Sequence, residues 1–130
     1  MKETRTISEE YAGIGAELIE TEPELRYIKN SDVKIVYLSS DLKKEASKVT
    51  ETLGQCEKVQ DKYKWGIPCD FTITVFEPNI EHFTPEQLRI LIFHELLHVG
   101  IDAKENYFCN PHDLEDFKVI IDRYGTDWAE

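Results

Sequence analysis

Three polar residues, His94, Glu95 and His98, interrupt an otherwise apolar segment. Projected at ~100° per residue, the apolar side chains cover nearly the whole circumference of a helix. These side chains are Leu88, Ile90, Leu91, Ile92, Phe93, Leu96, Leu97, Val99 and Ile101. A helix that is apolar on all sides is buried, and a buried carboxylate beside two imidazoles is costly unless something compensates it. The segment therefore predicts a buried helix whose narrow polar arc needs a partner, and a divalent cation would serve.

The two histidines of this arc are four residues apart. This spacing places their imidazoles ~40° apart around the helix axis, so that both can bind one ion. The pattern His-Glu-x-x-His is typical of a zinc peptidase. Glu95 is displaced ~100° from His94, which lets it reach water instead of the ion. The alternative is a pair of core histidines satisfied by backbone carbonyls, with Glu95 paired to one of them.

Zinc on two imidazoles needs at least one more protein ligand, and a remaining position can hold water. His112 is the only histidine downstream of the predicted helix. The surrounding sequence predicts a helix start, with Asn110 as the N-cap, and this second helix should continue to about Tyr124. We expect Gly100 to end the first helix in a left-handed conformation, so that the chain can turn back and His112 can reach the metal.

Other downstream donors remain alternatives for the third ligand, namely Asp102, Glu105, Cys109, Glu115 and Asp116. The Cys109 thiolate would bind zinc well, but thiolates suit closed structural sites better than hydrolytic ones. Asp116 lies one turn after His112 on the same helix face. It can accept a hydrogen bond from a ligand imidazole and orient it, or it can belong to a solvated acidic surface.

Two motifs, HELLH at residues 94–98 and HDLEDF at residues 112–117, are similar to those of the putative phage metallopeptidase family. They resemble the SprT/Spartan-like minimal zincins more distantly. The resemblance covers about Val33 to Tyr124 and implies that the third histidine comes from the start of the next helix. The chain has no C-terminal zinc ribbon of the Spartan kind, and its phenylalanine after His112 falls one residue later than in SprT-like proteins. The phage family is therefore the closer match.

Local patterns elsewhere predict an α+β, zincin-like domain over residues 1–130, with a small three-stranded sheet packed against helices. Ser8 can cap a first helix that ends before Pro23, because proline disfavours helix in the preceding residue. Residues 41–53 do not decide between helix and loop. Further elements are expected as a short helix at 24–29 and strands at 33–38, 55–65 and 69–76.

The composition limits partners and location. With 26 acidic against 15 basic residues, the net charge of -11 opposes contact with phosphate backbones, so no nucleic-acid partner is expected. We expect no membrane partner and a cytoplasmic location, because the sequence shows no signal peptide and no apolar run of membrane length. Three cysteines are an odd set without a disulfide framework, which is typical of ordinary thiols in a reducing compartment.

These observations predict a zinc-dependent peptidase with one Zn²⁺ per chain on His94, His98 and His112. Glu95 would take a proton from the metal-activated water and deliver it to the leaving amine. The substrate would be a polypeptide. By resemblance to zincins, it would dock as an added strand along Asp70–Phe76, unless that strand is internal.

Two other classes of function stay open. A three-histidine metal-dependent endoribonuclease would use similar zinc chemistry, but the acidic charge and the lack of a basic stripe argue against an RNA substrate. A non-catalytic zinc-binding module would need a closed site, with Cys109 as a fourth ligand. The sequence predicts neither the cleavage specificity nor the oligomeric state.

Overall fold

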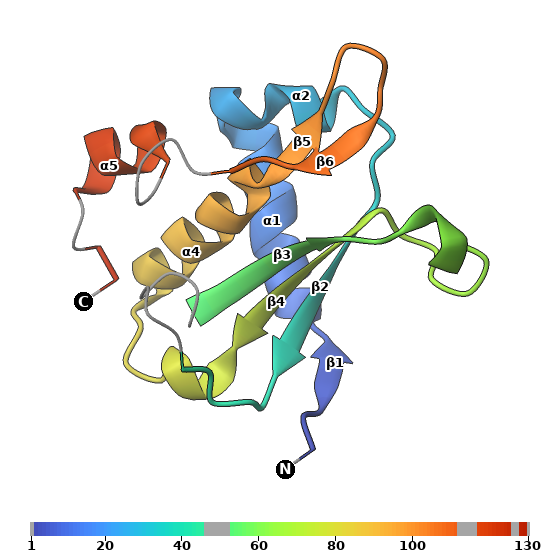
Figure 1. The fold of residues 1–130 in the computed structure, drawn as a ribbon. Coiled ribbons are helices and arrows are strands. Elements are labelled where there is room, and N and C mark those ends of the chain that lie inside the picture. The colour runs from blue at the N-terminus through green and yellow to red at the C-terminus, as the bar shows by residue number, and fades with distance from the viewer. Residues whose placement is uncertain (1, 46–52, 112–116, 126–127, 130) are drawn as a thin grey trace.

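The computed structural model describes residues 2–45, 53–111, 117–125 and 128–129. Their fold is α+β, as predicted, with helices packed on one face of a mixed sheet (Figure 1). Helix α1 (Glu9–Thr21) contacts strand β2, and helix α4 (Pro85–Leu97) contacts strand β3. Because α1 and α4 also contact each other, both helices cover the same face of the sheet.

The sheet has four strands in the order β1-β2-β4-β3. The predicted strands correspond to β2 (Ile35–Ser40), β3 (Gly54–Lys58) and β4 (Phe71–Phe76). Strand β2 is parallel to β4, whereas β3 is antiparallel to it. The additional strand β1 (Arg5–Ile7) pairs antiparallel with β2. All three of its residues are exposed, so β1 carries no hydrophobic alternation from which it could be predicted.

The expectation that Asp70–Phe76 forms a sheet edge is wrong. Strand β4 is hydrogen-bonded on both sides, and five of its six residues are buried. Within the described ranges, β3 is the edge strand beside it. The compositions agree with these positions, because β4 is almost continuously apolar whereas β3 carries Glu57 and Lys58, and charged residues are typical of strand edges.

The helices begin and end where local signals place them. The Ser8 hydroxyl accepts a hydrogen bond from the backbone N–H of Tyr11 over 3.1 Å and so caps α1. After Glu22, the chain forms the 3₁₀ turn Pro23–Leu25 and the short helix α2 (Arg26–Lys29), as predicted for this segment. The other helical elements among the described residues are α5 (Lys118–Tyr124) and the 3₁₀ turns Asp61–Tyr63 and Glu77–Asn79.

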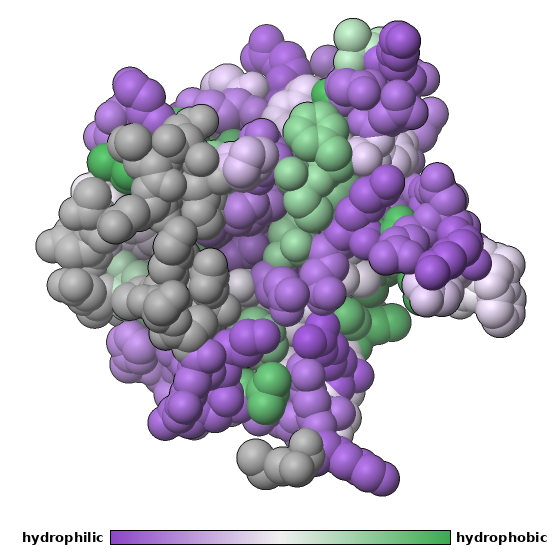
Figure 2. Space-filling model, in the orientation of Figure 1, coloured by the Kyte–Doolittle hydropathy of each residue, from purple (hydrophilic) through white to green (hydrophobic). Residues whose placement is uncertain are grey.

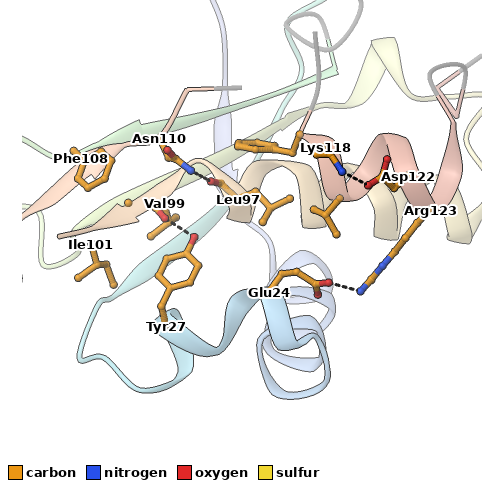
Figure 3. Close-up of a pocket in the computed structure, with 13 residues that line it drawn as sticks. Glu24, Tyr27, Leu97, Val99, Ile101, Phe108, Asn110, Lys118, Asp122 and Arg123 are labelled. Atoms are coloured by element: carbon orange, nitrogen blue, oxygen red, sulfur yellow. Dashed lines mark hydrogen bonds and ion pairs between the residues drawn. The ribbon is translucent and has the colours of Figure 1, made fainter. Parts of the chain in front are cut away.

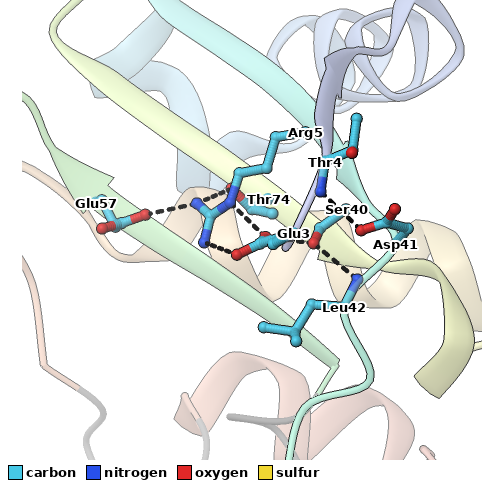
Figure 4. A network of polar contacts seen from close by, with 8 residues as sticks. All are labelled: Glu3, Thr4, Arg5, Ser40, Asp41, Leu42, Glu57 and Thr74. Carbon is cyan, nitrogen blue, oxygen red and sulfur yellow. Dashed lines mark hydrogen bonds and ion pairs between the residues drawn. The ribbon is translucent and has the colours of Figure 1, made fainter. Parts of the chain in front are cut away.

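The main core lies between the sheet and the two large helices. Side chains that contribute to it include Tyr11, Leu18, Phe71, Ile73, Val75, Leu91, Ile92, Phe93 and Leu96. On the other face, Arg5 of β1 reaches across the sheet to Glu57 of β3, at 3.1 Å, and to the Thr74 hydroxyl of β4, at 3.2 Å (Figure 4). The buried Thr74 hydroxyl is thereby satisfied, and Arg5 links the first strand to the opposite edge.

A hairpin follows the motif helix. It consists of β5 (Val99–Ile101) and β6 (Tyr107–Cys109), which pair antiparallel, and β6 also contacts β3. The molecular surface on this side is mostly hydrophilic, but a strip of hydrophobic side chains lies over β6, where Phe108 and Cys109 are exposed (Figure 2). None of the helices in the described ranges is long and apolar enough to cross a bilayer.

Candidate active site

Helix α4 starts with a complete capping box. The Thr84 hydroxyl accepts from the backbone N–H of Gln87 at 3.2 Å, and the Gln87 side-chain oxygen accepts from the Thr84 N–H at 2.8 Å. Pro85 occupies the first turn, where its missing N–H costs nothing. From Ile90 to Leu97 every residue is buried, which agrees with the predicted apolar circumference. The capping box fixes the start of α4 and the buried side chains fix its packing, so the motif residues in its last turn are held in place.

The three motif residues lie together at the end of this helix. One ligand atom from each of His94, Glu95 and His98 lies within 4.8 Å of the others. The two imidazole centroids are 5.1 Å apart, and His94 Nε2 lies 3.9 Å from Glu95 Oε2. His94 is only 1% exposed and Glu95 only 2%. Two nitrogen donors beside a buried carboxylate are a donor set suited to a divalent cation, so these residues fit a metal ion.

The end of α4 differs from the prediction. The helix stops at Leu97, and His98 follows in a right-handed conformation with φ -74°. Gly100 is not a left-handed helix end but lies within β5, so Val99 and Ile101 belong to a strand and not to the helix. A Cβ at Gly100 would lie 2.5 Å from the Phe108 ring, so a side chain at this position would displace the exposed ring that packs on β5.

Asn110 is the main site residue whose role the sequence did not indicate. It was predicted to start the next helix, but α5 begins at Lys118, after Phe117 as its N-cap. Its backbone N–H donates to the His98 carbonyl at 2.6 Å, and its side-chain amide donates to the Leu97 carbonyl at 3.2 Å. The last carbonyl groups of a helix lack hydrogen-bond donors within the helix. Here Asn110, which lies 12 residues after His98, supplies these donors.

The same residue fixes the protonation of His98. His98 Nδ1 lies 2.7 Å from the Asn110 carbonyl oxygen. Because a carbonyl can only accept, Nδ1 carries the proton and Nε2 carries the lone pair that a metal ligand needs. Ligand histidines are commonly oriented in this way.

Strand β3 passes directly over the carboxylate. A Cβ built on Gly54 would lie 3.2 Å from Glu95 Oε2 and 3.2 Å from the Thr74 carbonyl oxygen. The first residue of the edge strand is therefore in close contact with the motif. A polypeptide added along β3 would run beside Glu95.

The alternative donors that the structure describes lie elsewhere. Asp102 accepts from the backbone N–H groups of Asn106 and Lys104, which lowers its carboxyl pKa, and Glu105 is in the same hairpin turn with φ 64°. Cys109 faces β3 and is not in the metal-binding group found among the described residues. Glu115 and the two predicted residues His112 and Asp116 lie outside the described ranges.

A pocket of about 720 Å³ lies between the β5–β6 hairpin, α2 and α5 (Figure 3). None of the three motif residues lines it. The Tyr27 hydroxyl donates to the Val99 carbonyl at 2.6 Å, and Arg123 pairs with Glu24 at 2.6 Å. Burial raises the pKa of Tyr27 to about 12, so this hydroxyl stays a donor at neutral pH. These contacts hold the hairpin and α5 in place beside the motif.

The α+β fold and the buried His–Glu–His group are compatible with a small zincin-like fold. The family model described as putative phage metallopeptidase matches residues 4–130, so this chain belongs to that family. Searches of curated proteins and of solved structures give no match.

Proposed function

We propose that the protein is a zinc-dependent peptidase that hydrolyses peptide bonds, with residues 1–130 acting as one domain. The observation that carries the proposal is the Glu95 carboxylate, buried beside His94 and His98 under an edge strand. Burial of a carboxylate and two imidazoles in an apolar core costs stability, and such groups are typical of catalytic or metal-binding sites. Membership of a metallopeptidase family gives the same reaction class.

The proposed ligands of one zinc ion are His94, His98 and His112. Asn110, which precedes His112 by two residues in the sequence, lies against His98, and this supports the choice of His112 as the third ligand. Asp116 is proposed as an acceptor that orients an imidazole. When bound, zinc would polarise the substrate carbonyl and lower the pKa of a coordinated water to roughly 7.

The protein's own groups would handle the proton. Glu95 would accept a proton from the attacking water and deliver it to the departing amine. Its 2% exposure excludes bulk water, so the carboxylate is a fixed acceptor. The His98 Nδ1–H bond to the Asn110 carbonyl would keep the imidazole in one tautomer and one orientation through the cycle.

The substrate would be an extended polypeptide lying along β3, and not along β4 as the sequence suggested. Addition to a sheet edge uses main-chain hydrogen bonds and demands little sequence preference. Because Gly54 has no side chain, the space beside Glu95 stays open, and the scissile bond would lie there. The net charge of -11 supports a polypeptide substrate over a nucleic acid.

The test is a side-by-side assay of the zinc-loaded protein against a mixed peptide library and against single-stranded and structured RNA. Peptide cleavage that disappears in Glu95→Gln is the expected result. RNA cleavage dependent on Glu95, without peptide cleavage, would overturn the proposal in favour of a metal-dependent nuclease. Inactivity on both substrates with zinc retained would favour a non-catalytic zinc-binding module.

A further inference from the structure

Two cysteines that are far apart in sequence lie together beside the candidate active site. Cys56 is in the edge strand β3 and Cys109 is in β6 of the hairpin, 53 residues later. The Cys109 thiol donates to the Cys56 carbonyl oxygen at 3.8 Å, and strands β3 and β6 are in contact. The third cysteine, Cys69, is buried and lies outside both strands.

The two thiols differ in environment. Cys109 is exposed, whereas Cys56 is half-buried. The hydrogen bond donated by the Cys56 thiol, supported by the Lys58 backbone N–H, lowers the pKa of Cys109 to about 6 despite partial burial. The same hydrogen bond and burial raise the pKa of Cys56. Cys109 is therefore an accessible nucleophile, and Cys56 is a protonated thiol in contact with it.

We propose that Cys56 and Cys109 form a reversible disulfide when the protein meets a peroxide. The Cys109 sulfur would attack one peroxide oxygen and break the O–O bond, giving a sulfenic acid and one water. The Cys56 sulfur would then attack the Cys109 sulfur, breaking the S–O bond and releasing a second water. The two thiols lose two electrons and two protons in total, and the peroxide takes up both.

The bond would join the hairpin to the edge of the sheet. Strand β3 contacts both α4 and β6, and Asn110, which orients His98, directly follows Cys109. Locking β6 onto the middle of β3 would block the pairing groups of that edge. As a consequence that rests on the proposed function, oxidation would stop a polypeptide from docking there. In a reducing compartment such a bond is transient, which is typical of redox-sensing pairs.

The test treats the full-length protein with hydrogen peroxide and maps the products by mass spectrometry under non-reducing conditions. The expected product lacks two hydrogen atoms, contains one peptide pair linking Cys56 to Cys109, and returns to the starting mass with dithiothreitol. Of the three thiols, one should remain titratable. Cys69→Ser is the matched control and should form the same link, whereas Cys109→Ser should not.

The link between the cysteines can be measured on the wild-type protein, so the test does not depend on whether a variant folds. A link through Cys69, or oxidation of Cys109 to sulfinic acid without any link, would overturn the proposal. Peptide hydrolysis is measured on the same samples and should be lost on oxidation and recovered on reduction in wild type and Cys69→Ser only. Because the link is read by mass, failure of the peptidase proposal leaves this result unaffected, and failure to link leaves the peptidase proposal standing.

Discussion

Replacing Gly54 with alanine would place a methyl group against the candidate general base. The added Cβ would lie 3.2 Å from Glu95 Oε2 and 3.2 Å from the Thr74 carbonyl oxygen, so a neighbour must move by a few tenths of an ångström. The Thr74 carbonyl belongs to an internal strand paired on both sides and cannot yield easily. Glu95 or the edge strand β3 must therefore shift.

We expect two effects, one on stability and one on turnover. Overpacking costs about 1 kcal/mol at the lower end of its range, and the loss of glycine entropy in the unfolded chain offsets part of it. Stability should therefore fall by less than about 1 kcal/mol. Turnover should fall by about fourfold in kcat/KM, because a shift of a few tenths of an ångström is a fraction of the ~1 Å misplacement that costs on the order of 100-fold.

The assay combines urea unfolding with peptide hydrolysis, using Gly13→Ala as the matched control. Gly13 is exposed in the middle of α1, with no atom within 4 Å of its would-be Cβ. Gly13→Ala should stabilise the protein by about 0.5–1 kcal/mol and leave turnover unchanged. Unchanged turnover and unchanged stability in Gly54→Ala would refute the close contact between β3 and Glu95.

Two further predictions concern other parts of the chain. Thr84→Ala should lower the free energy of unfolding by about 1 kcal/mol, because it removes the cap of α4. Thr84→Ser keeps a hydroxyl and should retain most of that stability. Equal urea midpoints for Thr84→Ala and wild type would contradict the capping role. Alkylation of Cys109 by iodoacetamide should increase as the pH rises through about 6, since the hydrogen bond from Cys56 lowers its pKa, and buried Cys69 should remain unmodified in peptide mass spectra. A midpoint near that of a free thiol, about 8.5, would contradict the hydrogen-bonded pair.

The motif helix could be predicted because its signals are local. The all-round apolar pattern and the polar arc of His94, Glu95 and His98 depend only on helix periodicity, and the structure has both. Helix α1 is a similar case, with Ser8 at its start and a proline just beyond its end. In each segment, propensity and burial favour the same structure.

The features that the sequence missed depend on contacts between distant residues. The hairpin strands are only three residues long, which is too short for a recognisable strand pattern. Their position depends on hydrogen bonds from Tyr27 and Asn110, which are made between residues distant in sequence. Glycine is common at helix ends, but Gly100 pairs with Phe108 across the hairpin and so belongs to a strand. Whether β4 is internal depends on the pairing of three separate segments. His112 and Asp116 stay predictions.

The central claim is that zinc is held by histidines while Glu95 acts only on protons. The most direct measurement is zinc content by elemental analysis together with peptide turnover, both on one preparation of Glu95→Gln. We predict one zinc per chain and a turnover lower by roughly 10²- to 10⁴-fold, as expected for loss of a general base, whereas His98→Ala should lose the metal. Loss of zinc from Glu95→Gln, or turnover equal to that of wild type, would contradict the claim.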